Sequence, residues 1–206
     1  MTLKAARNEL SAARRALENM KSAKSFEVFE EEWRDFLNCV EKVWVKTERS
    51  SQHIRSKFQP WQGKYTALRR KDMLLRYLKQ TRDADNYSIQ KVAELKPGHR
   101  TMNFANPKGG YIKHMEIQGG NIVHYEGDPM IVIDHAPTVE AVRVQNSGIW
   151  YNPPTSHLDQ KVTSRYSVEL AELGLNFYET YVSEAVTPGF ALAQPRLHSF
   201  ILIAER

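Results

Sequence analysis

The chain has 206 residues and is 41% hydrophobic, with four Trp, nine Tyr and eight Phe, which is enough to build a substantial core. Its single cysteine, Cys39, excludes an intramolecular disulfide and a cysteine-rich zinc site. Charge is unevenly distributed, because residues 1–100 hold 22 Lys and Arg against 13 Asp and Glu, whereas residues 101–206 hold 7 against 11.

The basic half of the chain has two interpretations. A surplus of Lys and Arg attracts phosphate backbones through counterion release, which makes RNA a candidate partner. Alternatively, these side chains only cover exposed helix faces. No stretch approaches the roughly 20 apolar residues of a membrane span, and the N-terminus has no secretory pattern. We therefore expect a cytoplasmic protein without a membrane partner.

Two amphipathic helices are predicted before residue 51. Ser25 is a suitable N-cap for the second helix, and Glu27 in its first turn suits the helix dipole. The apolar residues recur at steps of three and four, as one face of a helix requires. In the first helix they are Leu3, Ala6, Leu10, Ala13, Leu17 and Met20, and in the second Phe26, Phe29, Trp33, Phe36, Leu37, Val40, Val43 and Trp44.

The segment "FQPWQG" at 58–63 is expected to interrupt the helical pattern, because proline lacks an amide hydrogen and glycine is a poor helix former. A short helix through Tyr65 and Leu68 should follow, with Trp61 anchoring its loop. Asp72 can then cap another helix, which carries Arg82 near its far end and stops before "KPGHR" at 96–100.

Beyond residue 100 the period changes from helical to alternating. Turns at Gly119-Gly120 and at 127–129, and a hairpin of "VEAVRV" and "IWYN", indicate short antiparallel strands. A long final helix follows "NPP" and ends at "TPGF", and the tail "FILIAER" is expected to add an edge strand or dock as an extended segment. The last helix has its apolar face at Val168, Ala171, Leu175, Tyr178, Val182 and Ala185.

These elements predict an α+β fold in which helices and strands are segregated along the chain. We expect a helical module at 1–96 and a small antiparallel sheet at 97–155. The C-terminal helix and tail at 156–206 should pack back on the helical module.

The segment "RDADNY", Arg82 to Tyr87, has the densest chemistry of the chain. On a helix Arg82 lies beside Asp85 at i,i+3 and beside Asn86 at i,i+4, which is the pattern of an ordinary ion pair with a polar neighbour. Arg82 and Tyr87 differ by about 140° around an ideal helix. They would therefore meet only across a dimer, or if the helix bends after Ala84.

An arginine, a polar residue, three further positions and a histidine form the signature of the HEPN family, and "RDADNY" resembles it. Arg82 and Asp83 match the first two positions, while Tyr87 stands where the family has histidine. The resemblance covers roughly 60 residues of the helical module. It implies an all-helical module in which the motifs of two protomers form a metal-independent ribonuclease site, without a cofactor.

The tyrosine changes what this resemblance implies for mechanism. Histidine can take and return a proton near neutral pH, whereas a tyrosine with an ordinary pKa of about 10 is a poor base there. Tyr87 could instead donate a hydrogen bond or stack on a base, and Arg82 could still hold a phosphate.

The histidines at 114, 124 and 135, with Asp134 beside the last, are residue types that bind zinc or iron. With a two-residue loop at Gly119-Gly120, Glu116 would pair with Val123, and His114 and His124 would point to opposite faces. A three-residue loop would bring them to one face. Surface or hydrogen-bonded histidines are the alternative, and no metal is expected.

Three functional hypotheses follow. The first is a non-catalytic or degenerate HEPN-like module that binds RNA or a protein, dimeric, with Arg82, Asp83 and Tyr87 lining the dimer groove. The second is a metal-independent endoribonuclease of toxin or phage-defence type, in which Arg82 performs the electrostatic role. The third is an interaction protein without a nucleic-acid role.

Overall fold

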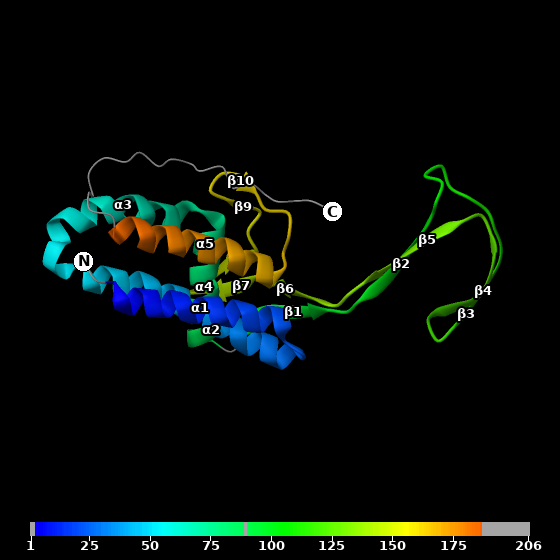
Figure 1. Cartoon of the computed structure of the whole chain (residues 1–206), viewed down its shortest axis with the longest axis horizontal. Coiled ribbons are helices and arrows are strands. Elements are labelled where there is room, and N and C mark those ends of the chain that lie inside the picture. Colours follow the sequence, from blue (N-terminus) through cyan, green and yellow to red (C-terminus); the bar gives the residue numbers. More distant parts are fainter. Residues whose placement is uncertain (1–2, 89, 187–206) are drawn as a thin grey trace. The chain divides into compact units, whose positions relative to one another are not determined.

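The computed structural model describes residues 3–88 and 90–186 (Figure 1). The chain divides into two units, one comprising residues 1–93 and 141–206 and the other Glu94–Glu140. We call them the helical unit and the β unit. The second boundary therefore falls at 140–141 instead of 155, because the short strands after residue 141 pack on the helices.

The first two helices form the foundation of the helical unit. Helix α1 spans Lys4–Ser22 and α2 spans Phe26–Ser50, and they make the most extensive contact between any two elements. The Ser25 side chain accepts a hydrogen bond from the Val28 amide at 3.3 Å, so the expected N-cap is present. The predicted apolar stripes are buried, except that Phe26 is partly exposed.

The predicted break at "FQPWQG" is wrong. A short 3-10 turn at Gln52–Ile54 leads into one continuous helix α3, Arg55–Lys71, with Pro60 inside it. Pro60 has no amide hydrogen, so the helical hydrogen bond to the Ser56 carbonyl is lost. Because Ser56 is exposed, water can bind that oxygen instead. In return the helix buries a continuous stripe of Phe58, Gln62, Tyr65 and Arg69. Tertiary packing outweighs the local cost of proline.

Helix α4 spans Met73–Tyr87 and α5 spans Ser167–Val186, and α5 packs against α1, α2 and α4. Aromatic rings join α5 to the other helices. The Tyr181 ring stacks on Trp44 at 4.9 Å and on Trp61 at 5.5 Å between ring centroids. Trp61 is thus an anchor, although it lies in a helix and not in a loop. The segments "TPGF" and "FILIAER" lie outside the described residues.

Four short strands belong to the helical unit. Strands β7 (Val144–Asn146) and β8 (Ile149–Tyr151) form an antiparallel hairpin, and β9 (Ser156–His157) pairs with β10 (Gln160–Lys161). The β7–β8 loop has φ values of 50° at Ser147 and 79° at Gly148, as a tight two-residue turn requires. Both hairpins contact α4.

The β unit consists of paired ribbons. Strands β1 (Ala93–Lys96) and β6 (Thr138–Ala141), where the chain leaves and re-enters the helical unit, pair with each other. Strand β2 (His99–Phe104) pairs antiparallel with β5 (Met130–His135), and β3 (Ile112–Gln118) with β4 (Asn121–Gly127). The structure describes every residue of this unit, and none of them is buried.

The α+β class is confirmed, since the described residues form five α-helices and small antiparallel pairs of strands. These strands form five separate two-stranded sheets among the described residues instead of one small sheet. In the described part of the chain, no helix is both long and apolar enough to cross a membrane.

Candidate functional site on helix α4

Arg82 lies in the last turns of α4 and is held by polar neighbours. Its Nη1 is 2.8 Å from Asp83 Oδ1, and its Nε donates to Asn38 Oδ1 of α2 at 3.3 Å. The Arg82 side chain is 29% exposed. Its guanidinium is therefore partly accessible, but one of its edges already faces a carboxylate.

Asp83 is nearly buried and receives two cations. Lys79 Nζ donates to Asp83 Oδ2 at 2.6 Å, on the carboxylate oxygen that Arg82 leaves unoccupied. Burial raises the pKa of this carboxyl, but the hydrogen bonds from Lys79 and Arg82 outweigh it and leave the pKa below the ordinary 3.8. Asp83 therefore remains ionised and compensates the charge of Arg82.

The i,i+3 spacing suggested an ion pair between Arg82 and Asp85, but the two side chains do not pair. Its Oδ1 accepts a hydrogen bond from Arg34 Nε of α2 at 2.8 Å. Asn38, one turn after Arg34, accepts from both Arg82 and Asn86, each at 3.3 Å. The polar face of α4 is thus paired with a polar strip of α2, and this arrangement positions the arginine.

Tyr87 is the last residue of α4 and its side chain is 79% exposed. The helix runs without a break through Ala84 to Tyr87, so the bend that would bring Tyr87 to Arg82 is absent from this helix. On one helix the two side chains stay about 140° apart. Arg82, Asp83 and Tyr87 therefore form no joint site within one chain, although Arg82 and Asp83 are in contact.

A second feature lies beside α4, at the β7–β8 hairpin. Trp150 is 51% exposed, and the Arg143 guanidinium lies 4.5 Å from the centre of its ring. A groove of about 200 Å³ passes between this hairpin and the first turns of α4. Its lining residues are Met73, Arg76, Tyr77, Ile149, Trp150, Tyr151 and Asn152.

The Trp150 hairpin is fixed to α4 by polar contacts. Tyr77 Oη donates to the Val142 carbonyl at 2.6 Å, and Asn146 Nδ2 donates to Gln80 Oε1 at 2.7 Å. These bonds position Trp150 against a helix and leave its side chain half exposed. Neither Arg76 nor Arg143 has a carboxylate partner among the described residues. The groove therefore combines the half-exposed Trp150 with Arg76, and Arg143 lies over the Trp150 ring outside the groove lining.

The groove and Tyr87 share one face of α4. Arg76 and Tyr87 are eleven residues apart. On an ideal helix their directions around the axis differ by only about 20°, and they lie about 16 Å apart along it. Both side chains are exposed. This α4 face thus presents an arginine near the groove and a tyrosine at the helix end.

The histidines form two pairs in the β unit. The β3–β4 loop has two residues, but a bulge beyond it pairs Glu116 with His124 instead of Val123. The His114 and His124 rings consequently lie 5.2 Å apart, and the expectation of opposite faces is wrong. The His135 ring stacks on the His99 ring, with 4.5 Å between the ring centroids. Among the described residues, no group of three or more His, Cys, Asp or Glu is placed to hold a metal ion.

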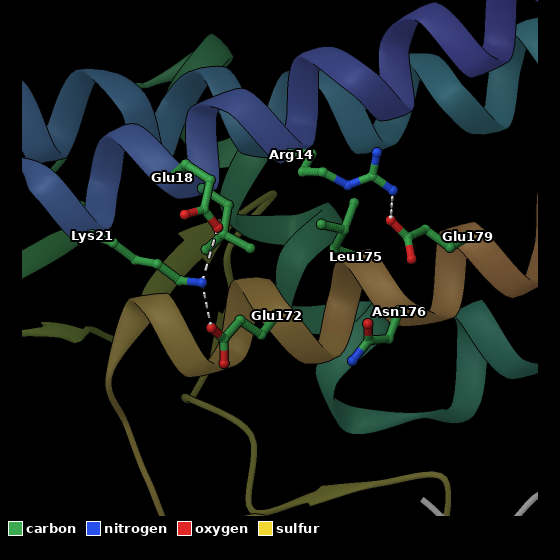
Figure 2. Close-up of a pocket in the computed structure, with 8 residues that line it drawn as sticks. Arg14, Glu18, Lys21, Glu172, Leu175, Asn176 and Glu179 are labelled. Carbon is green, nitrogen blue, oxygen red and sulfur yellow. Dashed lines mark hydrogen bonds and ion pairs between the residues drawn. The ribbon is translucent and has the colours of Figure 1, made fainter.

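Another groove, of about 340 Å³, lies between α1 and α5, and Figure 2 shows its charged side chains reaching across it. Arg14 pairs with Glu179, and Lys21 Nζ lies 2.9 Å from Glu172 and 3.0 Å from Glu18. These contacts, with Glu172 contributing most, raise the pKa of Lys21. Since its charges are already paired, this groove offers little to a charged ligand.

Comparisons with known family models, curated proteins and solved structures found no match to this chain.

Sequence reasoning missed the residues that surround Arg82 and Trp150. Arg34 and Asn38 are four residues apart on the polar side of α2, which indicates a shared face but not that α4 covers it. Arg143 and Trp150 lie on the predicted hairpin, but Trp150 pairs with Gln145, so its contact with Arg143 is diagonal across the two segments.

Proposed function

We propose that this protein is a non-catalytic, HEPN-like module that binds single-stranded RNA through the α4 face and the Trp150 groove. The observation that carries the proposal is the half-exposed Trp150 ring, with Arg143 4.5 Å from its centre and Arg76 in the same groove. Unpaired bases stack on such rings, while arginines attract the phosphates that connect them.

Charge supports a nucleic acid as the partner. The segments of the helical unit hold 25 Lys and Arg against 18 Asp and Glu, whereas Glu94–Glu140 holds 4 against 6. The positive charge of the chain therefore resides in the unit that carries the groove. The groove volume of about 200 Å³ is below the roughly 300–1,000 Å³ of small-molecule sites, but an open groove suits a single stacked ring.

The motif geometry supports binding over cleavage. Arg82 is held by Asp83 and Asn38, and Tyr87 is exposed on a different side of the helix. A neutral tyrosine hydroxyl does not take up a proton near neutral pH, so the pair lacks the general base that the family's histidine supplies. In this proposal Asp83 compensates the charge of Arg82, and the exposed Tyr87 offers a further ring at the end of α4.

The test measures the affinity of a short single-stranded RNA by fluorescence anisotropy at several salt concentrations. Trp150→Ala should weaken binding about 5- to 150-fold, since a base–aromatic stack contributes about 1–3 kcal/mol. Arg76→Ala and Arg143→Ala should each reduce the salt dependence by about one phosphate contact. Comparing the affinity for a DNA strand of the same sequence shows whether the protein recognises the 2′-hydroxyl of RNA.

Two variants serve as matched controls. Tyr111→Ala removes an aromatic ring that is 70% exposed in the β unit, and Arg14→Ala removes an arginine already paired with Glu179. Both should bind RNA like the wild type. Absence of RNA binding at low salt would overturn the proposal. Cleavage in the presence of chelator, abolished by Arg82→Ala, would replace it with the endoribonuclease hypothesis.

A further inference from the structure

The β unit, Glu94–Glu140, consists of residues that are exposed or only partly buried. It contains 47 residues, none of them buried, and its main ribbon has two strands, β2 and β5. A two-stranded ribbon is at best marginally stable in water, and three or more strands with an apolar face are needed for independent stability. Within the described residues, the β unit therefore lacks the further strands and cover that would stabilise it.

Strand β5 has the features of an edge strand that can pair with a further strand. Ile131, Val132 and Ile133 are 52%, 46% and 46% exposed, and the outer edge of β5 pairs with no strand in the described part of the chain. Exposed edges are normally protected by lysine, proline, a bulge or a cover. The run Met130–Ile133 contains no lysine or proline, and its pairing with β2 is regular. In contrast, the β3–β4 hairpin has register shifts at two places.

We propose that β5 pairs antiparallel with β5 of a second copy of this chain, forming a four-stranded sheet in the order β2–β5–β5–β2. The observations favour a protein partner over RNA, because the unit has 4 Lys and Arg against 6 Asp and Glu. This inference does not rest on the RNA-binding proposal, since the two concern different units.

The sequence of β5 is self-complementary in this arrangement. A two-fold axis at Val132 places Ile131 opposite the partner's Ile133, and Ile133 opposite the partner's Ile131. These apolar side chains therefore meet on the same face of the sheet. Asp134 then lies opposite the partner's Met130. The two Asp134 carboxylates are about 13 Å apart along the strands, beyond the screening length of about 8 Å. Each is also compensated by Arg100 of its own chain.

The first test is the oligomeric state of the full chain by sedimentation over a wide concentration range. The wild type should form dimers, and the double substitution Ile131→Lys with Ile133→Lys should abolish them, because like charges then face each other. The matched control is Ile117→Lys with Val123→Lys on the β3–β4 hairpin, where the side chains are 53% and 52% exposed. The control should dimerise like the wild type.

The second test fixes the register by a disulfide. Directly opposed residues of antiparallel strands have Cα atoms about 4.5–5.5 Å apart, within the range of about 4.4–6.8 Å that a disulfide spans. In a Cys39→Ser background, Val132→Cys should cross-link two chains on mild oxidation, and Val123→Cys should not. A wild type that stays monomeric, a dimer that survives the two lysines on β5, or equal cross-linking of both cysteines would each overturn the inference.

Discussion

His157 of β9 lies against the residue that begins helix α4, with its Nδ1 3.0 Å from Asp72 Oδ1. Asp72 is the N-cap of α4 and accepts from the Leu75 amide at 2.9 Å, while its second oxygen accepts from the Leu158 amide at 2.7 Å. Leu158 and Asp159 have φ values of 47° and 65°, so the β9–β10 turn adopts a left-handed backbone beside this contact. The Asp72 carboxylate thus connects helix α4, which carries the site, to the β9–β10 hairpin.

Replacing Asp72 should destabilise the protein more than removing an ordinary cap. Asp72→Ala loses the cap, worth about 1 kcal/mol, and leaves the His157 and Leu158 donors without their partner at about 1–3 kcal/mol each. We expect a loss of about 3–7 kcal/mol in urea unfolding, which is the sum of these contributions. Ser25→Ala, at the N-cap of α2 with a single hydrogen bond, is the control and should cost about 1 kcal/mol. Equal losses would contradict the connecting role.

Acid should weaken the fold through the same carboxylate. Burial raises the pKa of Asp72, but hydrogen bonds from His157 and from the Leu75 and Leu158 amides outweigh it and leave the pKa below 3.8. A folded pKa below the unfolded value stabilises the protein above about pH 4, and that stability is lost as the pH falls through the folded pKa. Unfolding free energy should therefore fall between about pH 5 and pH 2, and less steeply in Asp72→Asn.

Two helical glycines should respond in opposite directions to alanine. Gly63 in α3 has open space around the added Cβ, so Gly63→Ala should stabilise the protein by about 0.5–1 kcal/mol. At Gly174 of α5 the added Cβ would lie 2.5 Å from Cδ1 of the buried Leu78. Gly174→Ala should destabilise by about 1–2 kcal/mol, since overpacking exceeds the gain in helix propensity. Thermal unfolding of both variants checks the signs.

Placing the histidine of the HEPN signature at position 87 should not create a ribonuclease. Tyr87→His supplies a group with a pKa near 6.5, but Arg82 stays bound to Asp83 on another side of α4. We expect no cleavage of RNA in the presence of chelator, measured beside Tyr87→Phe as the control. Cleavage by Tyr87→His that requires Arg82 would show that two copies bring their motifs together, which would contradict this prediction.

Local patterns in the sequence were sufficient for the helices and turns that depend on near neighbours. The three- and four-residue steps of α1 and α2, the caps at Ser25 and Asp72, and the Gly119-Gly120 turn were all predicted and are present. Each of these features depends on side-chain period or on a hydrogen bond within one turn, so the sequence alone contains the necessary information.

Only the tertiary structure decided which distant groups meet. Pro60 stays inside α3 because a buried stripe spans it, and Asp85 pairs with Arg34 because α2 packs beside α4. A single bulge, invisible in the alternation, brought His114 and His124 together. Local spacing was enough to predict the amphipathic helices, their caps and the short hairpins. Packing decided the partners of Arg82 and Trp150, because contacts between distant residues depend on the whole fold and not on local spacing.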